Sequence, residues 1–461
     1  MFKKILIANR GEIAMRIIRC CQEMGIDTVL AVSEEDRDTL PAQFATEVVC
    51  VGPARAKDSY LNQNALITCA LGTGCEAIHP GYGFLSENAD FAEKVEKSGL
   101  TFIGPSSEMI RLAGDKESAR SLMKKSGVPV VPGSDGILKD PEEAREIAEK
   151  IGYPVLIKAS AGGGGRGMRI AQNEEEIENA FQEAQAEALA AFGNGDLYLE
   201  KLILKPHHIE VQILGDHDGH IIQLGERDCS MQRRNQKLIE EAPAVVLSPK
   251  TRLDIQRAAL KAAKAVRYES AGTVEFVLDP SGKFYFIEMN TRIQVEHTVT
   301  EMVTGIDLMR EQIRIAAGLP ISFKQSEVHV NGHAIECRIN AENPANNFAP
   351  CPGKVSFAHL PAGMNVRVES AIYSGSRVSP YYDSMIGKVI VKGGGRLDAI
   401  RKMRVALEEM TIDGVTTNTD FLYLIMHERD YVRGDFDTSY LKDHTDKILK
   451  WDSESKKRRR A

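Results

Sequence analysis

The sequence predicts an α/β protein that begins with a parallel β-sheet. An apolar run, Phe2–Ala8, is followed by apolar positions at helical spacing over Ile13–Met24 and by a second apolar run, Thr28–Val32. Strand, helix and strand in this order form a βαβ unit, which places a helix against a parallel sheet. Farther along, Thr273–Leu278 and Phe284–Asn290 alternate on either side of a turn that contains proline and glycine. This second pattern is typical of a β-hairpin.

Length and composition indicate a protein of several domains. The chain has 461 residues, which corresponds to about three domains of about 150 residues each. Its 43% hydrophobic and 27% charged residues are ordinary for globular proteins and exclude a largely disordered chain. A net charge of −7 argues against a nucleic-acid partner, and no apolar run is long enough to span a membrane. The basic run Lys456–Arg460 would suit an anionic partner, but we interpret it as a solvated terminus.

The cysteines and the N-terminus indicate a cytoplasmic protein. The eight cysteines are scattered, and no pair has the spacing of a zinc site. Most lie in apolar segments, where a free thiol behaves as a small buried side chain. The N-terminal apolar run stops at Asn9, which makes it too short for a secretory signal. We therefore expect a reducing compartment, the cytoplasm.

The rest of the chain divides into two further regions. The first, Asp115–Ala317, contains a glycine-rich loop and a long polar helix expected over Asn173–Phe192. The second starts near Ile321 and carries a predicted strand, Lys388–Val391, and a predicted helix, Leu397–Met410. Neither region shows an internal repeat.

The glycine-rich loop predicts phosphate binding. A short apolar strand that ends near Lys158 leads into Gly162–Gly165, and Arg166 follows at once. Consecutive glycines allow backbone N–H groups to approach phosphate oxygens closely, and the lysine adds a positive charge. The Walker A pattern is absent, and a flexible linker is the alternative. The flanking charges and strands favour a phosphate site.

The predicted hairpin carries oxygen donors suited to a metal ion. Residues two apart share a strand face, so Glu288 and Asn290 point the same way, and Phe284 and Phe286 are expected on that face too. Glu275 faces them from the partner strand if the register allows. Carboxylate and amide oxygens are hard ligands that suit Mg²⁺ held partly by nucleotide phosphates. An acidic edge strand facing water is the alternative.

Polar residues continue at alternate positions beyond the hairpin. If the segment stays extended, one face presents Glu288, Asn290, Arg292, Gln294 and Glu296. A solvated strand face would alternate in the same way, but beside a Mg-ATP site a guanidinium would bind a small oxyanion and Glu296 could act as a general base. Upstream, Glu226–Lys237 reads as a dense charged loop, either a surface loop or a cationic wall around anions.

Several longer motifs, in order along the chain, resemble biotin carboxylase from about Phe2 to Tyr440. They are Asn9–Ala14, His79–Asn88, Gly104–Pro105, Gly162–Gly165, Glu226–Ser230, Phe286–His297 and Glu336–Glu342. The resemblance implies a Rossmann-like, pre-ATP-grasp domain over residues 1–114 and an ATP-grasp domain over residues 115–320. A mobile glycine-rich lid would cover about residues 131–203, and a C-terminal α+β domain over residues 321–445 would precede a charged tail, 446–461.

The resemblance also implies an activity, the ATP-dependent carboxylation of a ureido nitrogen of biotin. ATP would be held by Lys116, Lys158, Gly164, Gly165, Glu200, Lys201, Leu202, Ile203, His208 and Asn235. Magnesium or manganese would be held by Glu275, Glu288 and Asn290, in agreement with the strand pattern. Bicarbonate would be held by Lys237, Arg292, Gln294 and the backbone of Val295.

The chemical roles implied by the resemblance centre on three side chains. Glu296 would deprotonate bicarbonate so that it attacks the γ-phosphate and gives carboxyphosphate. Arg338 would stabilise the enolate form of biotin, and Tyr82 would lie beside the biotin ring. Another ATP-grasp ligase and a non-enzymatic nucleotide-binding module are the alternatives. Arg338 and the segment Arg292–Glu296 argue against the first, and a metal triad argues against the second.

Two positions depart from the family pattern. Asn235 stands where many relatives carry histidine, and Thr298 stands where proline commonly follows the histidine after the catalytic glutamate. Because the fixed φ of proline is lost, the turn after Glu296 is expected to be looser.

The parts that the sequence lacks predict its partners. The biotinylation motif Ala-Met-Lys-Met is absent, and no length remains for a transferase domain. We therefore expect a separate biotin carboxyl carrier protein and carboxyltransferase subunits, and the family implies a homodimer. Acetyl-CoA carboxylase, which serves fatty acid synthesis, is the preferred parent enzyme. The ATP-binding subunit of pyruvate carboxylase, or another acyl-CoA carboxylase, is the alternative.

Overall fold

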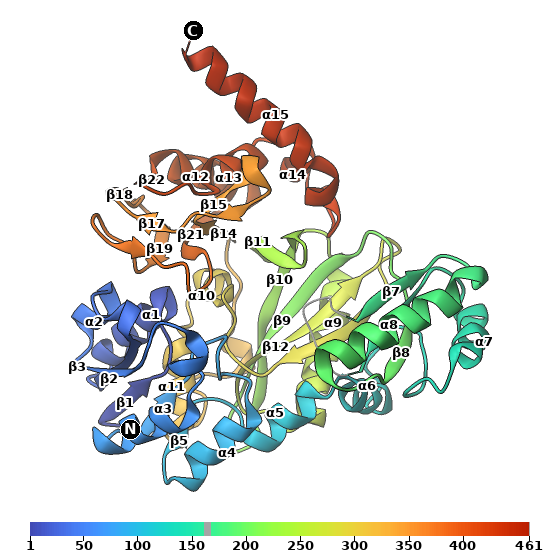
Figure 1. Ribbon diagram of the computed structural model, residues 1–461, viewed down its shortest axis with the longest axis horizontal. Helices are drawn as coiled ribbons and strands as arrows, with labels where there is room; N and C mark the ends of the chain where they lie inside the picture. Colours follow the sequence, from blue (N-terminus) through green and yellow to red (C-terminus); the bar gives the residue numbers. More distant parts are fainter. Residues whose placement is uncertain (161–166, 461) are drawn as a thin grey trace.

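The computed structural model describes residues 1–160 and 167–460 (Figure 1). The predicted nucleotide contacts Gly164 and Gly165 therefore lie outside the described residues. Lys116 is described only through its backbone, as the first residue of helix α6. Figure 1 shows an N-terminal unit in blue, a small green unit on the opposite side, long central strands between them, and an orange and red C-terminal unit above.

The N-terminal unit confirms the predicted βαβ start. Its sheet is parallel, with the order β3-β2-β1-β4-β5. Ile13, Ile17 and Cys20 lie on the buried face of α1, which explains their helical spacing. The elements are β1 (Lys4–Ile7), α1 (Gly11–Glu23), β2 (Asp27–Ser33), α2 (Leu40–Phe44), β3 (Glu47–Gly52), α3 (Gln63–Gly72), β4 (Ala77–His79), α4 (Ala89–Lys97), β5 (Thr101–Phe102) and α5 (Ser107–Gly114).

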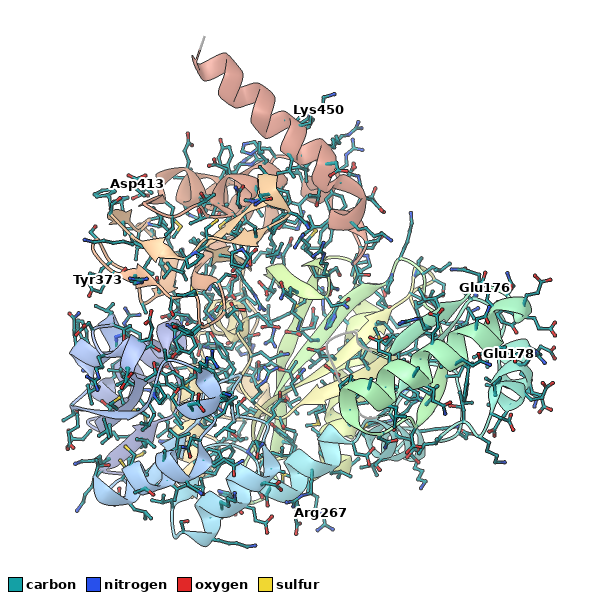
Figure 2. All side chains as sticks on the ribbon, in the orientation of Figure 1. Glu176, Glu178, Arg267, Tyr373, Asp413 and Lys450 are labelled. Carbon is teal, nitrogen blue, oxygen red and sulfur yellow. The ribbon has the colours of Figure 1, made fainter. Side chains whose placement is uncertain are left out.

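The small green unit carries the ends of the glycine-rich loop. Its sheet has the order β7-β6-β8, and the side chains of α7 and α8 pack with it in one core cluster. The long helix starts at Ile177, later than predicted, because Glu174–Glu176 form a short 3₁₀ turn that Asn173 caps. Figure 2 shows Glu176 and Glu178 pointing outward at the far end of this unit. The elements are α7 (Pro141–Ile151), β6 (Val155–Ala159), β7 (Met168–Ala171), α8 (Ile177–Phe192) and β8 (Leu197–Lys201).

A large antiparallel sheet joins the middle of the chain to its C-terminal part. The strand order is β13-β12-β9-β10-β11-β14-β21-β19, so β11 pairs directly with β14 from the C-terminal unit. The strands are β9 (His207–Gly215), β10 (Ile221–Arg233), β11 (Gln236–Ala242), β12 (Ser270–Leu278), β13 (Phe284–Asn290), β14 (His333–Asn340), β19 (Val366–Ser370) and β21 (Met385–Gly393). Side chains from distant parts of the sequence therefore share one surface.

The helices around this sheet complete the core. Alanine and isoleucine side chains of α9 are buried against β9 and β12, whereas Arg267, just beyond its end, lies exposed at the periphery (Figure 2). The helices are α6 (Lys116–Lys125), α9 (Pro249–Ala265), α10 (His297–Thr304), α11 (Leu308–Ala316), α12 (Arg396–Glu409), α13 (Thr419–Ile425), α14 (Arg429–Arg433) and α15 (Tyr440–Arg460). Short strands complete the C-terminal unit: β15 (Glu342–Asn343), β16 (Ala349–Pro350), β17 (Gly353–Lys354), β18 (Phe357–His359), β20 (Arg377–Val378) and β22 (Thr411–Asp413).

The prediction of a charged loop over residues 226–237 is wrong. These residues form most of β10 and the start of β11, and Glu226, Arg227 and Asp228 are buried. The charges do not force the segment to the surface because they pair inside the sheet. Arg227 Nε lies 2.5 Å from Glu210 Oε1 on the neighbouring strand β9.

The predicted hairpin is confirmed as β12 and β13, but the predicted face of its aromatic residues is wrong. Glu275 pairs with Glu288, and the next residue, Phe276, pairs with Phe286. One residue of β13 is therefore bulged, and a bulge moves the side chains beyond it to the other face. Phe286 accordingly packs in the same buried cluster as Met289.

The segment after the hairpin also differs from its prediction. The strand ends at Asn290, and Glu296 lies at the N-terminus of helix α10. The polar residues from Glu288 to Glu296 therefore do not lie along one extended strand. A turn between β13 and α10 brings them to the same cavity.

The described chain contains no helix that is both long enough and apolar enough to cross a membrane. Six of the eight cysteines are buried, as their apolar surroundings predict, and Cys50 is exposed. The last helix, α15, projects from the body of the protein at the top of Figure 1.

A buried ion pair between β11 and α12 predicts an acid-sensitive fold. Burial alone would raise the pKa of Glu241, but bonds from His333 Nε2 (2.9 Å) and Arg396 Nε (2.6 Å) lower it to about 2. A lowered folded-state pKa stabilises the fold above the unfolded value and loses that stabilisation as the pH falls toward 2. Urea unfolding at pH 6 and pH 3 should show that Glu241→Gln removes part of the acid-induced loss, on the order of 2 kcal/mol.

The exposed residue Glu408 on α12 offers a matched control for this measurement. Glu408→Gln should leave the difference in unfolding free energy between the two pH values unchanged. An equal acid-induced loss in the wild type and Glu241→Gln would contradict the assignment.

Candidate active site

One cavity lies where the three units meet. Its volume is about 1230 Å³, and its lining comes from the N-terminal unit (Glu87), the small unit (Lys158), the central strands (Glu275) and the C-terminal unit (Arg338). A cavity of this size exceeds what most small-molecule ligands fill. It has room for a nucleotide and a second substrate together.

Lys237 lines the cavity and contacts three carboxylates. From β11 its Nζ lies 2.6 Å from Glu210 Oε2, 3.0 Å from Glu275 Oε1 and 2.7 Å from Glu296 Oε1. Burial alone would lower the pKa of Lys237, but these carboxylates raise it well above its ordinary value. The lysine is therefore a permanent cation that holds three carboxylates together.

Glu296 is a buried carboxylate held between cations. Its Oε1 accepts a hydrogen bond from Lys237, and its Oε2 accepts one from Arg338 Nη2 at 2.9 Å. Burial alone would raise the pKa of Glu296, but Lys237, Arg338 and Arg227 lower it well below its ordinary value. The group is therefore ionised at neutral pH and can accept a proton from a ligand.

Arg338 links Glu296 to a second buried carboxylate. From β14 its Nε donates to Glu240 Oε1 at 2.6 Å, while its Nη2 reaches both glutamates. Burial raises the pKa of Glu240 to about 8, although Arg338 opposes this. Glu240 therefore fixes the plane of the guanidinium that faces the cavity.

The predicted metal donors lie together on the hairpin. Glu275 and Glu288 are cross-strand partners, and Asn290 Nδ2 donates to Glu275 Oε1 at 2.9 Å. Two carboxylates and an amide oxygen beside a nucleotide-sized cavity are a donor set that fits Mg²⁺. The residues present therefore fit the predicted ion.

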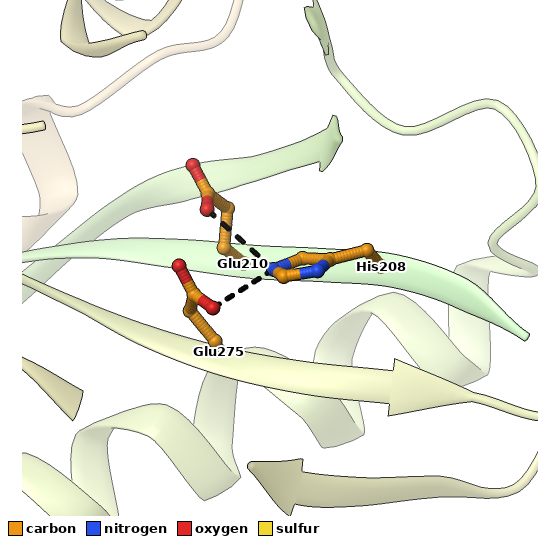
Figure 3. Close-up of side chains that lie close together, drawn as sticks. All are labelled: His208, Glu210 and Glu275. Atoms are coloured by element: carbon orange, nitrogen blue, oxygen red, sulfur yellow. Dashed lines mark ion pairs between the residues drawn. The ribbon is translucent and has the colours of Figure 1, made fainter. Parts of the chain in front are cut away.

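A second group, His208, Glu210 and Glu275, also has metal-like spacing (Figure 3). His208 Nε2 lies 2.9 Å from Glu275 Oε2 and 3.9 Å from Glu210 Oε2. Both oxygens of Glu210 are already held by buried cations, one by Arg227 and the other by Lys237. Glu275 belongs to both groups, and its oxygens likewise contact Lys237 and His208, so occupation by cations does not separate them. The donor types do: the carboxylate and amide oxygens of the hairpin suit Mg²⁺, whereas a histidine nitrogen suits softer metal ions.

Arg292 and Gln294 are held in place by neighbours outside the predicted set. Arg292 Nε lies 2.9 Å from Glu87 Oε2 of the N-terminal unit. Gln294 Oε1 accepts from Arg227 Nη2 at 2.8 Å, and its Nε2 donates to Glu275 at 2.8 Å. Both side chains therefore meet the cavity in a defined orientation.

The predicted nucleotide contacts gather on another wall. Lys158 Nζ lies 2.5 Å from Glu200 Oε2, and Lys201 Nζ donates to the carbonyl oxygens of Gly152 and Tyr153. Asn235 has a left-handed backbone (φ 63°) in the turn between β10 and β11. The cavity lining includes Lys158, Glu200, Lys201, Leu202, Ile203, His208, Asn235, Lys237, Glu275, Glu288, Asn290, Arg292, Gln294, Val295, Glu296 and Arg338.

Tyr82 differs from the other predicted site residues. Among the described residues it does not belong to the cavity lining, and it packs against the core of the N-terminal unit. Its hydroxyl donates to Glu12 Oε1. Its place beside biotin stays a prediction, and so does the nucleotide role of Lys116, whose side chain lies outside the described atoms.

The turn after Glu296 is well packed in spite of the missing proline. Thr298 is fully buried, and its hydroxyl donates to Glu336 Oε2 on β14. Proline has no group that could donate this bond. The bond ties the first turn of α10 to the sheet, so the expected loosening is not observed.

Comparison with known proteins decides the family. The description "Biotin carboxylase, N-terminal domain" matches residues 1–110, "Carbamoyl-phosphate synthase L chain, ATP binding domain" matches 115–324, and "Biotin carboxylase C-terminal domain" matches 336–443. Biotin carboxylase 1 of Bacillus subtilis (strain 168) is 54% identical over 442 residues, which is 96% of this chain and 98% of that protein. The chain belongs to the biotin carboxylase family. It is an ATP-dependent carboxylase of the ligase class.

Solved structures of biotin carboxylases have the same architecture. A biotin carboxylase from Campylobacter jejuni in complex with β,γ-ATP superposes with a TM-score of 0.93 at 51% identity, covering 96% of this chain and 99% of that one. The biotin carboxylase domain dimer of 2-oxoglutarate carboxylase from Hydrogenobacter thermophilus, with MgADP, ADP and bicarbonate, gives 0.91 at 53% identity over 96% and 98%. The three-domain α/β fold inferred from the motifs is thereby confirmed.

In this member of the biotin carboxylase family, several residues that order the cavity were not predicted as site residues. Glu210 shares a face of β9 with His208 and Gln212, a polar alternation that is visible in the sequence. Arg227 uses all five of its N–H donors on buried partners, and no sequence signal separates it from the neighbouring charges. Glu87 and Glu240 were not predicted either, and they orient Arg292 and Arg338, respectively.

Proposed function

We propose that this enzyme carboxylates biotin attached to a separate carrier protein, with ATP and bicarbonate as co-substrates. The observation that supports it most directly is Glu296, an ionised and buried base held between Lys237 and Arg338 in a nucleotide-sized cavity. The Hydrogenobacter thermophilus domain, which is described with bicarbonate and MgADP, is 53% identical.

In the first step, Glu296 takes the proton of bicarbonate. Bound next to Lys237 and Arg292, the bicarbonate anion would draw these cations toward itself, and the pKa of Glu296 would rise toward a useful value. The freed oxyanion attacks the γ-phosphorus of ATP, and ADP leaves, which gives carboxyphosphate. Lys158 and His208 line the wall where the phosphates would lie, and Mg²⁺ held by Glu275, Glu288 and Asn290 would neutralise phosphate charge.

In the second step, carboxyphosphate releases CO₂ and phosphate inside the closed cavity. The phosphate takes the N–H proton of biotin, and the ureido nitrogen attacks CO₂. Negative charge develops on the ureido oxygen, and Arg338 is held by Glu240 where it can stabilise this charge. Water must be excluded because carboxyphosphate hydrolyses readily.

We propose that a lid of about residues 131–203 belongs to an ATP-grasp domain over residues 115–320, flanked by an N-terminal domain (1–114) and a C-terminal domain (321–445) with a charged tail (446–461). We propose a biotin carboxyl carrier protein and carboxyltransferase subunits as partners, and a homodimer, since the 53% identical relative is described as a dimer. Acetyl-CoA carboxylase is the preferred parent enzyme. Relatives of similar identity include the small subunit of a 2-oxoglutarate carboxylase (53%) and one of the subunits of a pyruvate carboxylase (49%), so a keto-acid acceptor is the second candidate.

Release of phosphate from ATP tests the activity directly. The enzyme should cleave ATP only when bicarbonate is present, and free biotin should stimulate this cleavage. Indifference to both compounds would contradict the proposal. Copurification with a transferase subunit, followed by assays with acetyl-CoA, pyruvate and 2-oxoglutarate, would identify the final acceptor.

The proposed metal site leads to a prediction for Glu288. Glu288→Gln should weaken Mn²⁺ binding in the presence of ADP about tenfold or more, because a charged oxygen ligand is lost. Electron paramagnetic resonance of free Mn²⁺ measures this directly. Glu342→Gln, which changes another carboxylate of the same cavity, serves as the control and should leave Mn²⁺ binding unchanged. Equal binding by Glu288→Gln and the wild type would place the ion elsewhere.

A further inference from the structure

Lys388 is a fully buried lysine with no role in the chemistry described above. It lies on β21 in the C-terminal unit, and its register partner on β14 is Arg338. Its Nζ donates to the backbone carbonyl of Val295. Its nearest carboxylate oxygens are farther away, 3.8 Å at Glu12 and 3.9 Å at Glu336. The contact with the Val295 carbonyl is therefore its closest polar interaction.

This carbonyl belongs to the peptide bond between Val295 and Glu296. A peptide unit is planar, so a bond to its oxygen fixes the orientation of the whole plane. The plane in turn sets the Cα of Glu296, where helix α10 begins. The lysine thus reaches from the C-terminal unit to the backbone that carries the proposed base.

Lys388 lies where the C-terminal unit contacts the N-terminal unit and the segment that leads into α10. Glu12, at the start of α1 in the N-terminal unit, approaches Lys388 from one side and accepts a hydrogen bond from Tyr82. Glu336 approaches from the sheet and is held by Thr298, two residues after the base. Asn9 Nδ2 donates to the carbonyls of Pro80 and Tyr82 at 2.7 Å, and these bonds hold the loop that carries Tyr82, the partner of Glu12. A displacement of the N-terminal unit relative to β21 would therefore change the surroundings of Lys388.

Stability alone gives little reason for a lysine in this place. A buried charge is costly, and an apolar side chain of similar volume is often as stabilising as a buried ion pair. Burial raises the pKa of Glu12 to about 7, so about half of the negative charge of this neighbour is absent at neutral pH. The presence of an ammonium group here is best explained by its bond to the Val295 carbonyl, which orients that peptide.

We propose that Lys388 is a positioning residue that holds the Val295–Glu296 peptide, so that the bicarbonate-binding backbone and the base keep their mutual orientation. The inference rests on the proposed function. Loss of this bond misplaces Glu296 without removing it, and a misplacement of about 1 Å costs on the order of 10²-fold in rate.

Lys388→Met tests this assignment. We expect kcat for biotin-dependent ATP cleavage to fall about 10²-fold and the KM for bicarbonate to rise about tenfold. Affinity for ATP, measured by calorimetry, should stay at the wild-type value because the nucleotide wall is distant in the sequence and in a different unit. Lys388→Gln keeps a shorter donor and should retain more activity than Lys388→Met.

Lys392→Met, on the same strand β21, is the matched control and should match the wild type in rate. Wild-type rates in Lys388→Met would overturn the inference. So would a loss of ATP affinity as large as the rise in the KM for bicarbonate. If Lys388→Met does not fold, Lys388→Gln decides, and failure of both to fold would make the lysine a purely structural residue. Absence of bicarbonate-dependent ATP cleavage in the wild type would count against the proposed function instead.

Discussion

Glu296→Gln should reduce biotin-dependent ATP cleavage by about 10³-fold, within the range that general acid–base catalysis contributes. Glutamine preserves the size of the side chain and can still accept a bond from Lys237 or Arg338, but it cannot take the bicarbonate proton. Steady-state phosphate release at saturating bicarbonate and biotin measures the effect. Binding of ATP should persist, because Glu296 does not belong to the predicted nucleotide contacts.

Glu342→Gln provides the control in the same cavity. Its carboxylate accepts a bond from Ser384 and lies outside the cluster around Lys237, so we expect activity near that of the wild type. If Glu296→Gln retained wild-type turnover, another group would have to remove the proton, and the mechanism given above would be wrong.

Lys237→Met should have the second large effect, and on two properties at once. The cation stabilises three carboxylates, so its removal leaves Glu210, Glu275 and Glu296 in mutual repulsion. Breaking a buried pair costs about 3 kcal/mol or more in the free energy of unfolding. Loss of an electrostatic contact to a reacting anion costs about 10²- to 10³-fold in rate. Urea unfolding and bicarbonate-dependent ATP cleavage measure the two effects separately.

Lys264→Met is the appropriate control, since Lys264 lies exposed on α9. It should change neither stability nor rate. A folded Lys237→Met protein with normal response to bicarbonate would show that this lysine serves only the packing of the carboxylates and does not bind the substrate.

The two large predictions differ in what they probe. Glu296→Gln removes a proton acceptor and keeps only one of the two accepted hydrogen bonds, whereas Lys237→Met removes the charge that allows three acids to lie close together. Together they distinguish loss of proton transfer from loss of the ion pairs that hold the carboxylates in the cavity. Lys388→Met then tests whether a residue of the C-terminal unit keeps Glu296 in position.

Much of the site was predictable because strand alternation is a local property. Glu288 and Asn290 were expected on one face of the hairpin with Glu275 opposite, and the register of β12 and β13 confirms that pairing. The bulge that reverses the face of Phe286 was not predictable, because one extra residue leaves the alternation of the sequence intact.

Buried charge was the least predictable feature. The segment 226–237 reads as a solvated loop because it contains many charges, yet Arg227 is fully buried with every donor paired. The partners come from β9, β12, the turn before α10 and α10 itself, segments that are separate in the sequence. Only packing brings them together, and only then is the cost of burying the guanidinium offset.

The family, the N-terminal βαβ unit, the β12–β13 hairpin and the residue types of the cavity follow from the sequence alone, since motif order and side-chain period are local. The tertiary structure decided which of those residues meet. It placed Lys237 among three carboxylates, tied Arg338 to Glu240 and Glu296, and brought Lys388 from another unit to the backbone before Glu296. Such contacts depend on how strands order themselves in a sheet, and strand order is set by the packing of the whole chain.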